Sequence, residues 1–358
     1  MDPLIQLLYG IPVLGIVFQL AGYLIQIVPP IAPIIMRSAT PLALGALCGV
    51  VCERSGVVNI GIEGTMLASA FTGWAVGIAV APSLGGLPSD VFGITPTLLV
   101  ALGAALLVAV VIAALHAWLS ITIRADQIIS GTIINIAAFG VTGYLYSVIS
   151  KGSPVSGGSF AQFRLPAGVA DIPGVGWLLA MFLDQGPITM TVLVLVIVVQ
   201  VLLFRSRWGL RTRAVGEHPK AAETVGIDVI RLRYRNVILG GLLAGLGGAY
   251  LSMESTNVFE AGMTAGRGFI ALAAMIVGRW TPLGAFGAAL LFSSFQSLGQ
   301  VINFAPPPGD LGRLLTSFPG QTYDALPYIV TIIILAGVVG RSTPPAADGQ
   351  PYEREAAT

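Results

Sequence analysis

Long apolar runs dominate this sequence and constrain its fold more than any other feature. Ten candidate runs lie near residues 8–28, 31–51, 65–82, 97–119, 128–149, 174–204, 236–252, 269–279, 281–302 and 323–340. A helix needs about 20 mostly apolar residues to cross a bilayer. Only 10% of the residues are charged, against roughly 25% in soluble domains. The sequence therefore predicts an all-α, polytopic membrane protein with about ten transmembrane helices.

Basic residues indicate the orientation of these helices, because Lys and Arg collect in cytoplasmic loops. Residues 205–235 carry eight of the eighteen basic residues. If this loop is cytoplasmic and the chain crosses ten times, thirteen basic residues fall inside, four fall outside, and Arg37 lies within a span. Both termini are then cytoplasmic. Residues 1–341 are predicted to form the membrane domain, and the polar, Pro-rich residues 342–358 a disordered cytoplasmic tail.

Polar breaks interrupt several of the predicted helices. A break at 53–56 interrupts residues 39–71, and one at 278–282 interrupts residues 268–295. This similarity favours an inverted repeat, as in transporters whose halves move around a central site. The alternative is that Gly- and Ala-rich helices resemble one another by composition alone. A third break, at 184–187, predicts a short half-helix followed by a full span.

Motifs typical of enzymes are absent from the sequence. It contains no Gly-Lys-Ser/Thr phosphate loop, no His-Glu-x-x-His and no Gly-x-Ser-x-Gly. Two histidines and a net charge of +1 argue against a His-based metal site and against nucleic acid as a partner. We therefore expect no enzymatic activity, no bound cofactor and no ATP site in this chain.

Polar residues inside the apolar runs are candidates for a solute path. The stretch 53–64 combines glycines, an amide and carboxylates, and irregular polar backbone at membrane depth is tolerated where it is buried in protein or lines a wet cavity. The candidate path residues are Arg37, Asn59, Glu63, Asn135, Gln296 and Gln300. The alternatives are that residues 53–64 form a plain cytoplasmic turn and that the amides join helices to one another.

A short helix is predicted at the centre of the basic loop. Pro219 suits the first helical position and His218 the cap before it, while Gly226 suits the position after the end. So short a helix has little stability alone, so we expect its apolar strip of Ala221, Ala222 and Val225 to dock on a partner. The expected docking residues are Glu217, His218, Pro219, Lys220, Ala221, Ala222, Glu223 and Gly226. The alternative is a basic loop that rests on anionic lipid.

Three motifs resemble the permeases of ATP-binding-cassette importers for simple sugars and nucleosides, a branch of the branched-chain amino acid and ribose permease superfamily. They are Ser38-Ala39-Thr40-Pro41-Leu42, the run Glu53–Gly64 (ERSGVVNIGIEG), and Arg213-Ala214-Val215-Gly216-Glu217 with Pro219, Ala221-Ala222 and Gly226-Ile227. The resemblance covers most of residues 35–340. It implies that residues 1–341 are a permease domain and that the short helix contacts an ATPase subunit. His218 stands where the family often has Asn, which alters the cap and not the docking.

The resemblance also implies the solute and the partners. We expect a permease of the bacterial plasma (inner) membrane that carries nucleosides, with a simple sugar or a branched-chain amino acid as alternatives. Expected partners are two cytoplasmic ATPase subunits that hydrolyse ATP, a second, non-identical permease, an external substrate-binding lipoprotein and membrane lipids. A rival of another class is an ion-driven secondary transporter, which would need more ionisable residues near mid-membrane than Arg37 and His116.

Overall fold

The computed structural model describes residues 12–84, 93–150, 158–166, 168–169, 172–336 and 342–353, and every regular element in these residues is a helix. Seven of these helices are long and apolar enough to cross a membrane. They are α2 (Pro12–Glu53), α3 (Ile62–Leu84), α4 (Pro96–Ala117), α5 (Gln127–Ser150), α7 (Pro187–Arg205), α10 (Val229–Tyr250) and α12 (Pro282–Phe304). The predicted all-α class and the presence of several candidate membrane spans are therefore confirmed.

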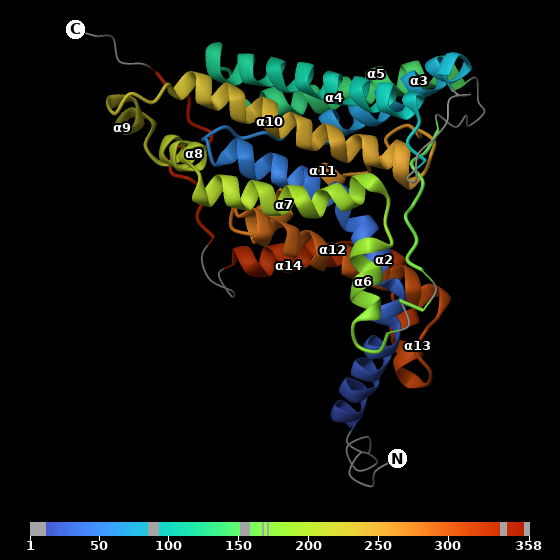
Figure 1. The fold of residues 1–358 in the computed structure, drawn as a ribbon. Coiled ribbons are helices and arrows are strands. Elements are labelled where there is room, and N and C mark those ends of the chain that lie inside the picture. The colour runs from blue at the N-terminus through green and yellow to red at the C-terminus, as the bar shows by residue number, and fades with distance from the viewer. Residues whose placement is uncertain are drawn as a thin grey trace.

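Shorter helices complete the described part of the chain. They are α6 (Gly176–Leu183), α8 (Arg207–Glu217), α9 (Pro219–Thr224), α11 (Arg267–Val277), α13 (Asp310–Thr316) and α14 (Gly320–Leu335), with π-helical turns η1 (Trp118–Thr122) and η2 (Leu251–Ser255) extending α4 and α10. The long helices run side by side, and α8 and α9 project at one end of the bundle (Figure 1). We refer to this end as the α9 end.

The first two predicted spans, 8–28 and 31–51, form one helix, so their separation is wrong; residues 8–11 lie outside the described residues. Helix α2 has 42 residues and contains Pro29, Pro30, Pro33 and Pro41, so it is about 63 Å long at 1.5 Å per residue. Its N-terminal part leaves the direction of the bundle (Figure 1). The prolines bend this helix without ending it, as neighbouring helices allow in membrane proteins.

Two other predicted spans are divided or shortened. The break expected at 184–187 is confirmed, because α6 ends at Leu183 and Pro187 opens α7. The run 269–279 overlaps the 11-residue helix α11 (Arg267–Val277), which is about 16 Å long and cannot cross a bilayer alone. Non-helical residues 256–266 precede it, so irregular backbone and a half-helix together replace the expected continuous span.

The two breaks that suggested an inverted repeat touch each other. Trp280 Nε1 donates to Glu53 Oε2 at 2.6 Å, and Arg54 Nε donates to the Trp280 carbonyl at 2.8 Å. Helices α2 and α11 therefore run in the same sense and end together at the α9 end. Segments related by inversion would place their breaks at opposite ends of the bundle, so the inverted relation between 39–71 and 268–295 is wrong.

Helix α10 lies inside the bundle because glycines let its neighbours approach. A Cβ on Gly241 would lie 2.3 Å from the Cβ of Ala113, and one on Gly248 would lie 2.0 Å from the carbonyl oxygen of Met66. Small residues at helix interfaces are the usual means of close packing in lipid. Helix α10 thus runs through the bundle from the α9 end to the polar residues of η2.

Candidate functional site

A polar cavity of about 280 Å³ lies where α2, η2 and α12 meet. It contains three of the six predicted path residues, Arg37, Gln296 and Gln300, which come from distant parts of the sequence. Its other polar lining residues are Ser38, Gln162, Tyr250, Glu254, Ser255 and Arg267. Because α10 begins at the α9 end and η2 follows it, the cavity lies toward the opposite end.

Arg37 ties three elements together at the wall of this cavity. Its Nε donates to Gln185 Oε1 at 3.2 Å, and its Nη2 donates to the Asp184 carbonyl at 3.3 Å. The Tyr250 hydroxyl donates to the Arg37 carbonyl at 2.7 Å. Pairing with oxygen acceptors offsets part of the cost of a charge inside the membrane, which is about 2.5–3.5 kcal/mol on insertion scales. Arg37 therefore faces the cavity instead of turning outward.

Glu254 is a site residue that the sequence reasoning missed. Its Oε2 accepts from Ile188 N at 2.7 Å, and its Oε1 accepts from Thr189 N at 3.1 Å and Thr189 Oγ1 at 2.6 Å. The carboxylate thus satisfies the first amides of α7, where an anion is favoured. A Cβ on Gly186 would lie 2.3 Å from Glu254 Cδ, so only glycine fits there. The available signal was that Glu254 is the sole charged residue in 236–258.

Glu63 and Asn135 lie apart from the polar cavity. Glu63 accepts from Gly266 N at 2.8 Å and Gly268 N at 2.6 Å, at the start of α11. Asn135 donates to the Ile60 carbonyl at 3.0 Å and accepts from Gly64 N at 2.7 Å. Both line a second, largely apolar cavity of about 370 Å³. The hydrogen bonds of Asn135 join α5 to α3 and the residues before it, as the alternative interpretation of the amides expected, and Glu63 joins α3 to the start of α11.

Asn59 is also outside the polar cavity. It is buried, and its Nδ2 lies 3.8 Å from Cys48 Sγ and 4.0 Å from Cys52 Sγ. The neighbouring Val58 N donates to Gln127 Oε1 at 2.7 Å, and Glu53 is only 6% exposed. Residues 54–61, between α2 and α3, are therefore irregular backbone buried in protein, not a solvated turn.

The predicted short helix exists as α9, with the expected start and end. Pro219 is its first residue, and Gly226 after its end has φ = 81°, in the left-handed region that glycine favours. The predicted apolar strip is divided, however. Ala221 and Val225 are exposed, whereas Ala222 is 4% exposed and packs with Val215 and Tyr352. Only part of the strip is available to a partner.

Residues 342–353, which we name the C-terminal segment, pack on the α9 end and depart from the predicted disorder. Ala347 N donates to the Gly216 carbonyl at 2.9 Å, Ala346 N donates to Glu217 Oε2 at 3.1 Å, and the Tyr352 hydroxyl bonds to Glu223. The segment is polar overall, so composition alone predicts disorder; Ala347 and Tyr352 nevertheless find buried sites on distant elements. Arg341 and Arg354 lie outside the described residues.

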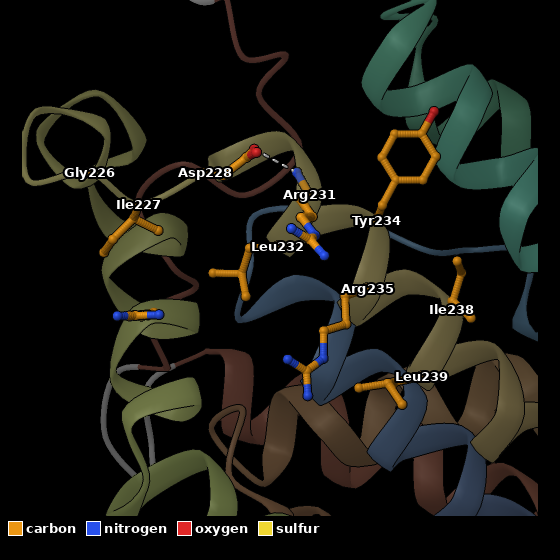
Figure 2. Close-up of a pocket in the computed structure, with 10 residues that line it drawn as sticks. Gly226, Ile227, Asp228, Arg231, Leu232, Tyr234, Arg235, Ile238 and Leu239 are labelled. Carbon is orange, nitrogen blue, oxygen red and sulfur yellow. Dashed lines mark hydrogen bonds between the residues drawn. The ribbon is translucent and has the colours of Figure 1, made fainter.

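A basic groove of about 810 Å³ lies beside α9, between α8 and the start of α10. Arg211, Arg231 and Arg235 line it together with apolar residues that include Ile238 and Leu239. Arg231 and Arg235 project from the same face of α10, one turn apart (Figure 2). The groove therefore combines cationic side chains with an apolar wall that continues into a candidate membrane span.

Comparison with known proteins identifies the family. The family described as the branched-chain amino acid transport system permease component matches residues 31–335. The chain is 38% identical over 331 residues to the guanosine ABC transporter permease protein NupQ of Bacillus subtilis, covering 92% of this chain and 98% of NupQ. It is 35% identical over 316 residues to the nucleoside ABC transporter permease protein NupC of Lactococcus lactis, covering 88% and 93%.

A third relative is named for a different solute. The putative glucose ABC transporter permease protein TsgC13 of Haloferax volcanii is 32% identical over 337 residues, covering 89% of this chain and 96% of TsgC13. No solved structure matches the chain. The family and the seven apolar helices make this a multi-pass protein of the plasma (inner) membrane, with a transport role and not an ATPase role. With its match extending over residues 31–335, the chain belongs to the permease component family of branched-chain amino acid transport systems.

Proposed function

We propose that the chain is the permease subunit of an ATP-driven importer of nucleosides. The observation that carries this proposal is its similarity, over nearly its full length, to permeases named for guanosine and nucleosides. The more distant glucose relative keeps a simple sugar as the second candidate. A branched-chain amino acid is a further alternative, from the family description.

The polar cavity is the proposed solute site. A nucleoside offers ribose hydroxyls and base edges that both donate and accept hydrogen bonds, and Gln296 and Gln300 supply amides that do the same. Arg37 and Arg267 add donors, and Glu254 adds an acceptor. The volume of about 280 Å³ is near the lower end of ligand pockets, roughly 300 Å³. We expect the cavity to change its exposure as the transporter cycles.

Helix α9 is the proposed contact with the ATPase. Ala221 in α9 and Val225 just after its end are exposed, which allows close approach of a partner surface. Two ATPase subunits, a second and non-identical permease, and an external binding lipoprotein would complete the importer. ATP hydrolysis in the partners would move α9 and shift the cavity between its two exposures.

The proposed topology places the α9 end in the cytoplasm. The loop with eight basic residues lies there, and Arg54 and Arg124 also contact elements of this end, through Trp280 and Glu353. We keep a cytoplasmic C-terminal segment as part of the proposal. A cytoplasmic start of α2 is not proposed, because this single helix begins at the end of the molecule opposite the α9 end (Figure 1). The ten crossings would require further spans beyond the seven long helices, from segments such as α14 and the 256–277 stretch.

Anionic lipid is the proposed occupant of the basic groove. Clusters of Arg beside a span attract anionic headgroups at about 1 kcal/mol per residue, and Ile238 and Leu239 offer a surface for an acyl chain. Replacing Arg231 and Arg235 by Gln should lower binding of phosphatidylglycerol in nanodiscs, whereas replacing Arg205 and Arg207, which do not line the groove, should not. Equal binding by both variants would contradict the lipid assignment.

The test of the proposed function uses Ala221→Glu. The substitution adds a charge on an exposed face of α9 and should abolish ATP-driven uptake while the protein still inserts into the membrane. Ala222 is unsuitable, because its burial means that a charge there would disturb the loop itself. Thr343→Glu, an exposed position outside α9, is the control. Uptake by Ala221→Glu at the wild-type rate would contradict the docking role. Uptake abolished by an ionophore with ATP maintained would favour the secondary-transporter rival.

A further inference from the structure

The C-terminal segment and α9 enclose a common groove of about 490 Å³. One wall consists of residues 217–221, and the other consists of Ala346, Ala347 and residues 350–353. The two walls are more than 120 residues apart in the sequence. We name this feature the α9–tail groove.

The tail wall is fixed to the bundle by buried groups. Arg233 is 1% exposed, and its Nη1 donates to the Gln350 carbonyl at 3.0 Å while its Nε donates to the Ser55 carbonyl at 3.0 Å. Tyr352 is 7% exposed and packs with Ala222. At the surface, Arg124 and Glu353 add an exposed ion pair at 2.5 Å. A wall held by backbone carbonyls and buried side chains is preformed, which lowers the entropy cost of binding a partner.

The same segment contacts the irregular backbone that leads to α3. Gly56 has φ = 82°, and a Cβ there would lie 2.6 Å from Arg233 Nη2 and 2.9 Å from the Ala347 carbonyl oxygen. A Cβ on Gly216 would lie 2.3 Å from the Arg54 carbonyl oxygen. The groove walls and residues 54–56 therefore form one continuous set of close contacts, of the kind through which a displacement can pass.

The surface of the groove suits a protein segment. Its lining mixes prolines and alanines (Pro219, Ala221, Ala346, Pro351) with both signs of charge at Glu217, Lys220 and Glu353. Most of these residues are exposed at the α9 end. Two carboxylates against one ammonium do not favour a phosphate or an anionic lipid, whereas small apolar residues with a charged rim are typical of a protein interface.

We propose that the C-terminal segment forms half of the docking site for the ATPase subunit, so that the partner is gripped between α9 and residues 346–353. This inference rests on the proposed function and extends it. Docking on α9 alone would leave the partner free to rotate about a six-residue helix, whereas two walls fix its orientation. The displacement of the partner then reaches residues 54–56 directly, through Ala347.

The experiment measures the affinity of the purified ATPase subunit for the assembled permease pair in nanodiscs. Ala346→Glu places a charge on the tail wall, and Thr343→Glu places the same charge on an exposed position of the same segment outside the groove. We expect Ala346→Glu to weaken ATPase binding about tenfold and Thr343→Glu to leave it unchanged. A chain ending at Arg341 should lose at least as much affinity, and an unchanged unfolding temperature of the point variants would exclude misfolding.

Ala221→Glu, measured in parallel, separates this inference from the proposed function. If Ala221→Glu weakens ATPase binding and Ala346→Glu does not, the docking role of residues 346–353 is refuted, whereas the proposed function is not. If neither variant weakens binding, the docking role of α9 fails as well. If the chain ending at Arg341 binds the ATPase more tightly, the segment is a cover that the ATPase displaces, and the proposal is overturned.

Discussion

The carboxylate of Glu254 should hold the start of α7 in place, and Glu254→Gln should show it. The two carboxylate oxygens accept from two different backbone amides, Ile188 N at 2.7 Å and Thr189 N at 3.1 Å. A glutamine presents one acceptor oxygen and one NH₂ group. Whichever way it turns, one of these amides faces a donor. The Thr189 hydroxyl can rotate to accept, but a backbone N–H cannot.

The magnitude follows from these contacts. One stranded buried donor costs about 1–3 kcal/mol, and loss of an anion at a helix N-terminus costs about 0.3–1 kcal/mol and up to about 2 kcal/mol in partly buried sites. A neutral glutamine also avoids the desolvation cost of a buried carboxylate, and this gain opposes the two losses. That gain is limited, because Arg37 and Arg267 line the same cavity and would lose their nearby anion. We therefore expect a loss of about 2–4 kcal/mol in unfolding free energy.

The assay is thermal unfolding of the purified protein in detergent, followed by tryptophan fluorescence. At about 2 °C per kcal/mol, the value for larger domains, Glu254→Gln should lower the midpoint by about 4–8 °C. Glu260→Gln is the matched control, because the same change six residues later falls on an exposed side chain and should have almost no effect. A midpoint for Glu254→Gln within about 1 °C of the control would refute the reasoning.

Three further predictions concern the solute site, the packing of α11 and the C-terminal segment. Replacing Gln296 and Gln300 by Leu should raise the KM for nucleoside uptake about tenfold, or about 1.4 kcal/mol, without lowering the unfolding temperature; an unchanged KM would remove these amides from the site. Gly268→Ala should destabilise the protein by about 1–3 kcal/mol, because its Cβ would lie 2.6 Å from the backbone of Glu63, whereas Gly287→Ala meets nothing within 4 Å; equal midpoints would contradict this packing. Burial raises the pKa of Asp348 to about 6, against the attraction of Arg233 and beside the carboxyl of Glu53. Protonation therefore favours the packed C-terminal segment: this stabilisation is complete below the reference value of 3.8 and is lost as the pH rises through about 6. Proteolysis of the segment should be slower at pH 5 than at pH 8, and a pH dependence that persists in Asp348→Asn would contradict the assignment.

Features with local causes could be predicted from the sequence. Pro219 and Gly226 fix the ends of α9 through their own backbone preferences, and Asp184 to Pro187 divide α6 from α7 in the same way. The prolines of α2 could not be interpreted so simply. Whether a proline ends or bends a helix depends on neighbours that satisfy the freed carbonyls, and these neighbours are distant in sequence.

Features with distant causes required the structure. Glu254 caps a helix that begins 67 residues earlier, at Pro187, and no local pattern connects them. Ala347 and Tyr352 are buried by partners on α8, α9 and α10, so the composition of the segment alone gave no indication of order. Of the path candidates, Arg37, Gln296 and Gln300 share a cavity, while Glu63 and Asn135 bind backbone at helix starts. Sequence shows which polar residues lie in the membrane, but only packing decides which of them face a cavity.

The central claim is that this chain moves solute only when a separate ATPase acts on its α9 end. The direct measurement is uptake of labelled guanosine into proteoliposomes that contain the permease pair and binding lipoprotein, with and without the ATPase subunit and internal ATP. We predict uptake only when the ATPase and hydrolysable ATP are both present. Guanosine accumulation by the permease pair without the ATPase subunit would contradict the claim.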